Sequence, residues 1–177
     1  IDMVDVFVGH IRGGLGVVGI ISCAIFGSIC GAACATLSCI GAIMFPRFKA
    51  GGYPMGHACA LMANASLLGL LIPPNATLII FAWISGISVL ACFLSTIGPG
   101  IVTIILLSVV NLWMLRENKD VLVSQKRSGK ERYEMFMKRG RLAIPALFMP
   151  FMVLGGIYGG VMTTTEASAL AVVYCIP

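Results

Sequence analysis

The sequence predicts an all-α, polytopic membrane protein, and three observations support this fold class. Hydrophobic residues make up 59% of the 177 positions and charged residues only 11%, whereas a soluble domain carries about 25% charged residues. The charges are clustered, which leaves residues 13–46, 50–115 and 142–165 without any. These stretches lack the alternating pattern of barrel strands. Apart from closed barrels, only helices satisfy all their backbone hydrogen bonds in lipid.

The first uncharged stretch, at about 13–46, is predicted to form a re-entrant hairpin. As one helix it would measure about 50 Å, which exceeds a ~30 Å hydrocarbon core, yet two spans would need about 40 residues. Its centre, Gly27–Thr36, is rich in small residues and suits a tight tip, broken near Gly27–Gly31. A hairpin also returns Arg12 to the side of Arg47, as the positive-inside rule favours.

The second uncharged stretch predicts two spans, of which the first is interrupted. Pro73 and Pro74 lie within an apolar run, and each removes an N–H group and clashes with the preceding helical turn. We therefore expect a discontinuous helix at about 54–86, broken at Gly69–Asn75. A further span is expected at about 89–115.

Residues 116–141 are predicted to form a cytoplasmic loop, with a short amphipathic helix near 129–139. Nine basic residues against four acidic ones in a short loop mark the cytoplasmic side of a membrane protein. This topological role accounts for the basic residues, so no nucleic-acid partner is expected.

Residues 142–177 are predicted to contain another span, ending near residue 163, and the start of a new helix. Thr164 or Thr165 would be the N-cap of that helix. Glu166 would lie in its first turn, where the helix dipole favours a carboxylate.

The predicted hairpin tip and helix break form the candidate ion and substrate site. In secondary transporters, paired discontinuous helices offer backbone carbonyls to cations and half-helix N-termini to anions. This region contains no acidic side chain, so neutral oxygens would hold a monovalent cation rather than Ca²⁺ or Mg²⁺. The alternative is that glycine and proline only kink packed helices. The candidate residues are Gly27, Ser28, Cys30, Gly31, Ala32, Thr36, Asn64, Ser66, Gly69, Pro73, Pro74 and Asn75.

Neither an enzyme nor a bound cofactor is expected. An intramembrane enzyme needs a nucleophile with a base, or paired carboxylates, and the three uncharged stretches contain no Asp or Glu. His10 and His57 lie near the predicted cytoplasmic boundary, where His57 is either a proton-linked group or an interfacial packing residue. The seven cysteines form no CxxC pair and are interpreted as small apolar packing residues.

Three segments of the chain together resemble one transporter family. They read GGLGVVGIISCAIFGSICGAACATLSCIGAIMFPRFKAGGYP, ANASLLGLLIPPN and ALFMPFMVLGGIYGGVMTTTEASALAVVY. In this order they are similar to the large permease subunit of TRAP transporters (tripartite ATP-independent periplasmic transporters), over essentially the whole chain. The resemblance implies an elevator-type fold of two inverted repeats, with residues 1–115 as the first and 142–177 as the start of the second.

The resemblance also implies a function, which is sodium-coupled import of an organic acid, such as a C4-dicarboxylate, across the bacterial inner membrane. Members of the family work with a periplasmic substrate-binding protein and a small membrane permease subunit. By position, the tip and the break would jointly hold sodium at Gly31, Gly69 and Asn75, mostly through backbone atoms. Because the chain begins with Ile1 and ends at Pro177 within a helical pattern, we expect it to be a fragment.

The tip and the break depart from the family pattern at several positions. The family tip commonly reads SGSA with an acidic residue shortly after, whereas this chain has Cys30–Ala33 there and Thr36 at the acidic position. After the two prolines the family usually has serine, and this chain has Asn75. Backbone atoms can still bind an ion after such side-chain changes, whereas hydroxyl ligands are lost with the side chains that carry them. The alternative function is therefore a non-transporting structural or assembly protein that keeps the fold.

Overall fold

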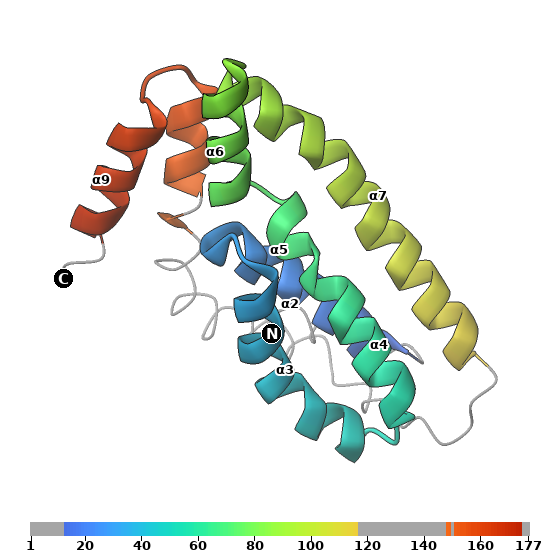
Figure 1. Cartoon of the computed structure of the whole chain (residues 1–177). Helices are drawn as coiled ribbons and strands as arrows, with labels where there is room; N and C mark the ends of the chain where they lie inside the picture. Colours follow the sequence, from blue (N-terminus) through green and yellow to red (C-terminus); the bar gives the residue numbers. More distant parts are fainter. Residues whose placement is uncertain (1–12, 117–147, 150, 175–177) are drawn as a thin grey trace, which may run out of the picture.

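The structure, a computed structural model, describes residues 13–116, 148–149 and 151–174. Within these ranges the regular elements are all helices (Figure 1), which confirms the predicted all-α class. Residues 151–158 are helical as well. The named helices are α2 (Gly14–Cys30), α3 (Ala33–Ala50), α4 (Met55–Ser66), α5 (Leu68–Leu71), α6 (Ala76–Ser85), α7 (Val89–Leu115) and α9 (Thr164–Tyr174).

Helices α2 and α3 pack against each other as a hairpin. Gly31, with φ +63°, takes the left-handed conformation that ends α2, and its N–H donates to the Gly27 carbonyl at 2.8 Å. Helix α2 therefore continues through Gly27 and breaks at Gly31, the last residue of the predicted break Gly27–Gly31. The predicted end of the hairpin near residue 46 was too early, because α3 continues through Pro46. Met44 and Phe48, on either side of that proline, are fully buried and hold the helix against the core.

The predicted discontinuous helix is broken over a shorter segment than expected. The helical run Met55–Leu71 meets α6 at an angle of 44°. Gly69 lies within α5, because the Ile72 N–H still donates to the Leu68 carbonyl at 2.9 Å. Helical bonding stops only where Pro73 and Pro74 have no N–H to donate.

Helix α7 runs from Val89 to Leu115 as predicted and is continuous through Pro99. In the described part of the chain it is the one helix long and apolar enough to cross a membrane by itself. The bent pair Met55–Leu71 and Ala76–Ser85 would count as a second span. The outer surfaces of α6 and α7 expose large apolar side chains such as Trp83, Ile105 and Trp113, as lipid-facing helices do.

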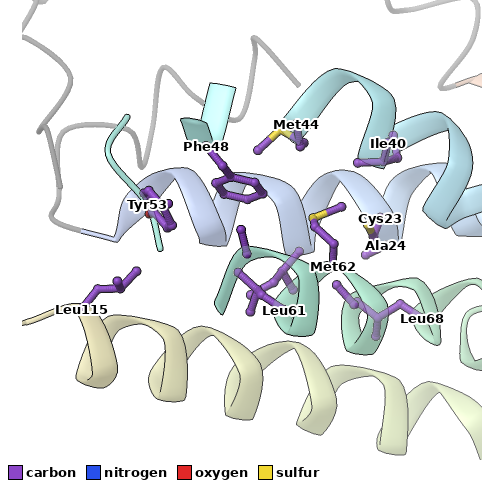
Figure 2. Close-up of a cluster of buried hydrophobic side chains, with 13 residues drawn as sticks. Cys23, Ala24, Ile40, Met44, Phe48, Tyr53, Leu61, Met62, Leu68 and Leu115 are labelled. Atoms are coloured by element: carbon purple, nitrogen blue, oxygen red, sulfur yellow. The ribbon is translucent and has the colours of Figure 1, made fainter. Parts of the chain in front are cut away.

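The main core lies around α2, which packs against α3, α4, α5 and α7. Figure 2 shows Met44 and Phe48 from α3 facing Met62 and Leu68 across α2. Cys23 is fully buried among these side chains, in the packing role expected for the cysteines. Cysteines exposed in the described residues are Cys30, Cys34, Cys39 and Cys59. A smaller core joins Phe93 of α7 to side chains of the segment 148–174.

The turn before α9 corrects two predictions. The helical segment ends at residue 158, so the described part of the predicted span is shorter than the expected limit near 163. The helix α9 is capped by Thr163 rather than by Thr164 or Thr165. The Thr163 N–H donates to the Glu166 carboxylate at 2.7 Å, and the Glu166 N–H donates to the Thr163 hydroxyl at 3.3 Å. Only Thr163 stands three residues before Glu166, the spacing of a capping box.

We expect Glu166→Ala to loosen the start of α9, because the Thr163 N–H would lose its acceptor. Glu166→Gln is the control, since glutamine keeps an acceptor at the same position of the capping box. Hydrogen exchange measured by mass spectrometry should be faster around Thr163 in the alanine variant and unchanged in the glutamine variant. Equal exchange in all three proteins would contradict the capping role.

Apart from Arg116, the predicted cytoplasmic loop and its helix near 129–139 lie outside the described residues. Residues 142–147, at the beginning of the predicted second repeat, do so as well. The cytoplasmic placement of the loop stays a prediction.

Candidate ion and solute site at the hairpin tip

The hairpin tip and the broken helix are in direct backbone contact. A Cβ added to Gly27 would lie 2.6 Å from the Cα of Gly69, so only glycine permits this approach. A Cβ added to Gly31 would lie 2.8 Å from the carbonyl oxygen of Pro74. Figure 1 shows α5 beside the end of α2. The two elements that the sequence singled out separately therefore lie side by side.

Four helix ends meet at this contact. Helices α2 and α5 end here, and α3 and α6 begin here. Helix C-termini present unpaired carbonyls with partial negative charge, and N-termini present unpaired N–H groups with partial positive charge. The first turn of α3 contains no acidic side chain, and no side chain caps it. The junction can therefore offer oxygens to a cation and N–H groups to an anion.

The two prolines release backbone carbonyls in the last turn of α5. In a continuous helix the Gly69 and Leu70 carbonyls would accept from residues 73 and 74, but both are prolines without an N–H. The Leu70 carbonyl instead accepts from the Asn75 side chain at 2.6 Å. The Gly69 carbonyl has no helical donor four residues ahead, which leaves a neutral oxygen suited to a cation.

Asn75 holds the break in shape. Its side chain is only 3% exposed, and its amide nitrogen donates to the Leu70 carbonyl while its Oδ1 accepts from the Thr77 N–H at 2.8 Å. The second bond is an N-cap that starts α6. One side chain therefore connects the end of α5 to the beginning of α6.

Thr36 places a hydroxyl between the hairpin and the broken helix. The residue is fully buried, and its hydroxyl donates to the Ala32 carbonyl at 2.9 Å. A Cβ added to Gly69 would lie 2.7 Å from this hydroxyl oxygen, so the oxygen lies directly against the Gly69 backbone. Because the Thr36 hydroxyl already donates its proton to Ala32, its oxygen can only accept a further hydrogen bond or bind a cation there.

The remaining candidate residues are arranged differently. Ser28 donates to the Ile25 carbonyl at 2.7 Å and lines the cavity described below, whereas Cys30 is exposed. Ser66 is buried and donates to the Ala63 carbonyl at 2.7 Å. The exposed Asn64 donates to the Ala60 carbonyl at 2.8 Å. Ser66 and Asn64 are thus bonded within α4, and their role at the site stays a prediction.

A cavity of about 220 Å³ lies next to the junction. It is lined by residues from the tip, the break and α6 and by residues from the helical segment before α9 and from α9 itself. Most of the lining is apolar, with hydroxyl groups from Ser28 and Ser168. The lining residues are Ser28, Ile29, Pro74, Ile79, Met149, Val153, Ile157, Ala167, Ser168 and Ala171.

Comparison with known proteins decides the family. Residues 1–177 match the family described as "Tripartite ATP-independent periplasmic transporter, DctM component". The chain belongs to the TRAP transporter large permease family. This assignment confirms the resemblance found in the sequence, and it places the chain among transporter subunits rather than enzymes.

Three similar TRAP permeases carry different substrate names. The chain is 36% identical over 176 residues to an ectoine TRAP transporter large permease protein of Halomonas elongata. It is 33% identical over 174 residues to a C4-dicarboxylate TRAP transporter large permease protein of Pseudomonas aeruginosa. It is 32% identical over 176 residues to a 2,3-diketo-L-gulonate TRAP transporter large permease protein of Escherichia coli. These alignments cover 98–99% of this chain but 40% of each relative's length.

Sequence reasoning missed two features of this TRAP permease chain. The side of the cavity lined by Met149, Val153, Ile157 and residues of α9 has no local signal, because it arises from contact between distant segments. Asn111 lies fully buried in α7 and does have a signal. It is a strongly polar side chain within a long apolar run, where such residues are costly unless they are paired.

Proposed function

We propose that this chain is part of a permease subunit that imports a small organic acid across the bacterial inner membrane together with sodium. The contact between hairpin tip and broken helix supports this proposal, because it brings two helix C-termini and two helix N-termini to one place. The periplasmic substrate-binding protein and the small membrane permease subunit are the proposed partners, and elevator-type movement of the hairpin the proposed mechanism.

The cation is proposed to be sodium, held by neutral oxygens at the tip and the break. Gly31, Gly69 and Asn75 are the proposed sodium-binding positions. The Gly69 carbonyl has no N–H donor four residues ahead in the helix. The buried Thr36 hydroxyl lies against the same glycine and adds a side-chain oxygen. A monovalent cation suits such a site better than a divalent one, since no carboxylate is present among residues 13–116.

The proposed anion site uses the N-termini of α3 and α6. Both begin at the junction, where the helix dipoles favour a carboxylate without an arginine or lysine. The adjoining cavity of about 220 Å³ is smaller than the roughly 300–1,000 Å³ of typical ligand pockets, which favours a small solute. Two of the similar permeases are named for carboxylates, a C4-dicarboxylate and a diketogulonate.

The re-entrant course of the hairpin has support at its base. The N–H of Gly16, at the start of α2, donates to the Tyr53 hydroxyl, beyond the end of α3, at 3.0 Å. A Cβ added to Gly51 would lie 3.4 Å from the Leu15 side chain. The two ends of the hairpin therefore lie together, as a segment that enters and leaves on one side requires.

Thermal unfolding of the full-length permease in detergent tests the sodium site. The sample would be compared in NaCl, KCl and choline chloride at equal ionic strength. We expect sodium alone to raise the melting temperature, since a ligand at 100 times its Kd adds about 2.7 kcal/mol. Gly31→Ala should abolish this shift, because its Cβ would meet the Pro74 carbonyl at 2.8 Å.

Gly86→Ala is the matched control for that variant. Gly86 ends α6 with φ +68°, close to the +63° of Gly31, but nothing lies within 4 Å of its Cβ position. Both alanines carry the same left-handed strain of about 1–2 kcal/mol, yet only Gly31→Ala disturbs the junction. If both variants keep the sodium shift, the ion is bound elsewhere.

The alternative is a non-transporting membrane protein that keeps the transporter fold. The tip sequence Cys30–Ala33 favours it, since no hydroxyl side chain remains there to bind an ion or substrate. A full-length protein that shows no sodium-dependent stabilisation at any reachable concentration would support this alternative.

A further inference from the structure

A second buried polar cluster lies at the opposite end of α2 from the tip. Its centre is Asn111 in α7, which is fully buried. The Asn111 Nδ2 donates to the Gly13 carbonyl at 2.8 Å, and its Oδ1 lies 3.1 Å from the Nε2 of His57. These bonds connect residues 98 and 54 positions apart in the sequence.

The hydrogen-bond directions in this cluster are determined by its members. The Gly13 carbonyl can only accept, so the amide nitrogen of Asn111 must face it and Oδ1 must face His57. His57 therefore donates from Nε2. The neutral Nε2–H tautomer carries the proton that this bond needs.

Two residues shape the space around Asn111. A Cβ added to Gly16 would lie 2.7 Å from the amide carbon of Asn111, so glycine is required for the amide to fit. The Gly16 N–H donates to the Tyr53 hydroxyl. Burial raises the pKa of Tyr53 to about 12. The cluster thus joins the beginning of α2, the α3–α4 connection, the first turn of α4 and the last turns of α7.

This bonding selects one position of α7 along the hairpin base. A buried amide is costly unless it is hydrogen-bonded, and a slide of one helical turn, about 5.4 Å, would break both bonds. A second packing contact of α7 lies nearer its N-terminus, where Gly100 is buried next to Leu71 and Ile72. The two contacts are about 16 Å apart along the helix axis, so a slide or a pivot of α7 would disturb at least one of them.

We propose that Asn111, held by Gly13 and His57, is a latch that locks α7 to the base of the hairpin. With the latch closed, α7 moves together with the hairpin and the broken helix as one body. The movement itself rests on the proposed transport function, whereas the closed latch does not. Asn111 acts as a positioning residue, since it lies at the far end of α2 from the candidate site.

Distance measurements between spin labels test the latch in the full-length permease in lipid nanodiscs. One label replaces Met55 in α4 and the other Met114 in α7, both exposed near the cluster. Labels introduced through a noncanonical amino acid avoid reaction with native cysteines, seven of which lie in this chain. We expect one narrow distance distribution, unchanged between NaCl and KCl. Asn111→Leu should broaden this distribution and lengthen its mean.

A reference pair and a conservative variant complete the test. Labels at Ile43 and Met55 report on the hairpin and α4 alone, and their distance should not change in Asn111→Leu. His57→Gln keeps an N–H donor and should preserve the narrow distribution, whereas His57→Leu should broaden it. If Asn111→Leu also changes the Ile43–Met55 distance, this variant no longer isolates the latch. The comparison of His57→Gln with His57→Leu then tests whether the latch holds α7.

Two results would overturn the latch. One is a Met55–Met114 distance in the unmodified permease that changes between NaCl and KCl. The other is a distribution that stays narrow in Asn111→Leu and in His57→Leu. Failure of the sodium site is a separate result, because it appears as an absent melting-temperature shift and leaves these distances unaffected.

Discussion

Replacing Gly27 by alanine is expected to separate the hairpin tip from the broken helix and to abolish sodium-dependent stabilisation. The added methyl group would lie 2.6 Å from the Cα and 2.9 Å from the nitrogen of Gly69. These are backbone atoms within two packed helices, so they cannot move aside as the end of a flexible side chain could. Overpacking of this kind costs about 1–3 kcal/mol.

The loss of sodium-dependent stabilisation and of uptake in Gly27→Ala should exceed what the lower stability of the variant alone predicts. The same shift would move Gly69 away from the Thr36 hydroxyl and would alter the four helix ends on which the proposed ion site depends. Melting temperatures in NaCl and KCl, together with uptake into proteoliposomes that contain the partner subunits, measure the two effects separately. We expect Gly27→Ala to lose the sodium shift and the uptake, even at temperatures where the variant remains folded.

Gly98→Ala provides the control for Gly27→Ala. Gly98 lies within α7, and nothing is found within 4 Å of its Cβ position. Alanine is favoured over glycine inside a helix by roughly 0.5–1 kcal/mol, so this variant should be as stable as the unmodified protein or slightly more so. If Gly27→Ala retains both the sodium shift and full uptake, the close contact is not needed for function.

Asn75→Ala is expected to have the second large effect, through the two bonds that this side chain makes. Loss of the N-cap of α6 costs about 0.5–2 kcal/mol. The Leu70 carbonyl would also lose its donor in a buried position, which costs about 1–3 kcal/mol. Together the two losses are expected to destabilise the protein by about 1.5–5 kcal/mol.

Two conservative variants separate these contributions. Asn75→Ser keeps an acceptor for the Thr77 N–H. Asn75→Asp also keeps the cap but cannot donate to the Leu70 carbonyl. Chemical denaturation should rank serine and aspartate between the unmodified protein and alanine. An alanine variant as stable as the unmodified protein would show that the break is held by the prolines alone.

Where local chemistry decides an element, the sequence predicted it well. Helix α7 has the predicted boundaries, because an uncharged and mainly apolar run of this length is long enough to form one membrane-spanning helix. The break after Leu71 follows from two consecutive prolines, which lack N–H groups in any context. Its exact beginning was misplaced, because one more helical bond, from Ile72 to Leu68, forms before the prolines. The hairpin continues beyond its predicted end at about residue 46, because burial of Met44 and Phe48 keeps α3 helical around Pro46.

By itself the sequence determined the membrane class, the family and the positions of the two broken elements, since apolar run length, proline chemistry and motif order are properties of short segments. Tertiary structure alone decided which backbones touch at the tip. Gly27 and Gly69 are 42 positions apart, and nothing local to either marks their contact. The same holds for Asn111, whose partners Gly13 and His57 are brought to it by packing. Contacts between distant segments depend on how whole helices pack, which no local pattern of residues encodes.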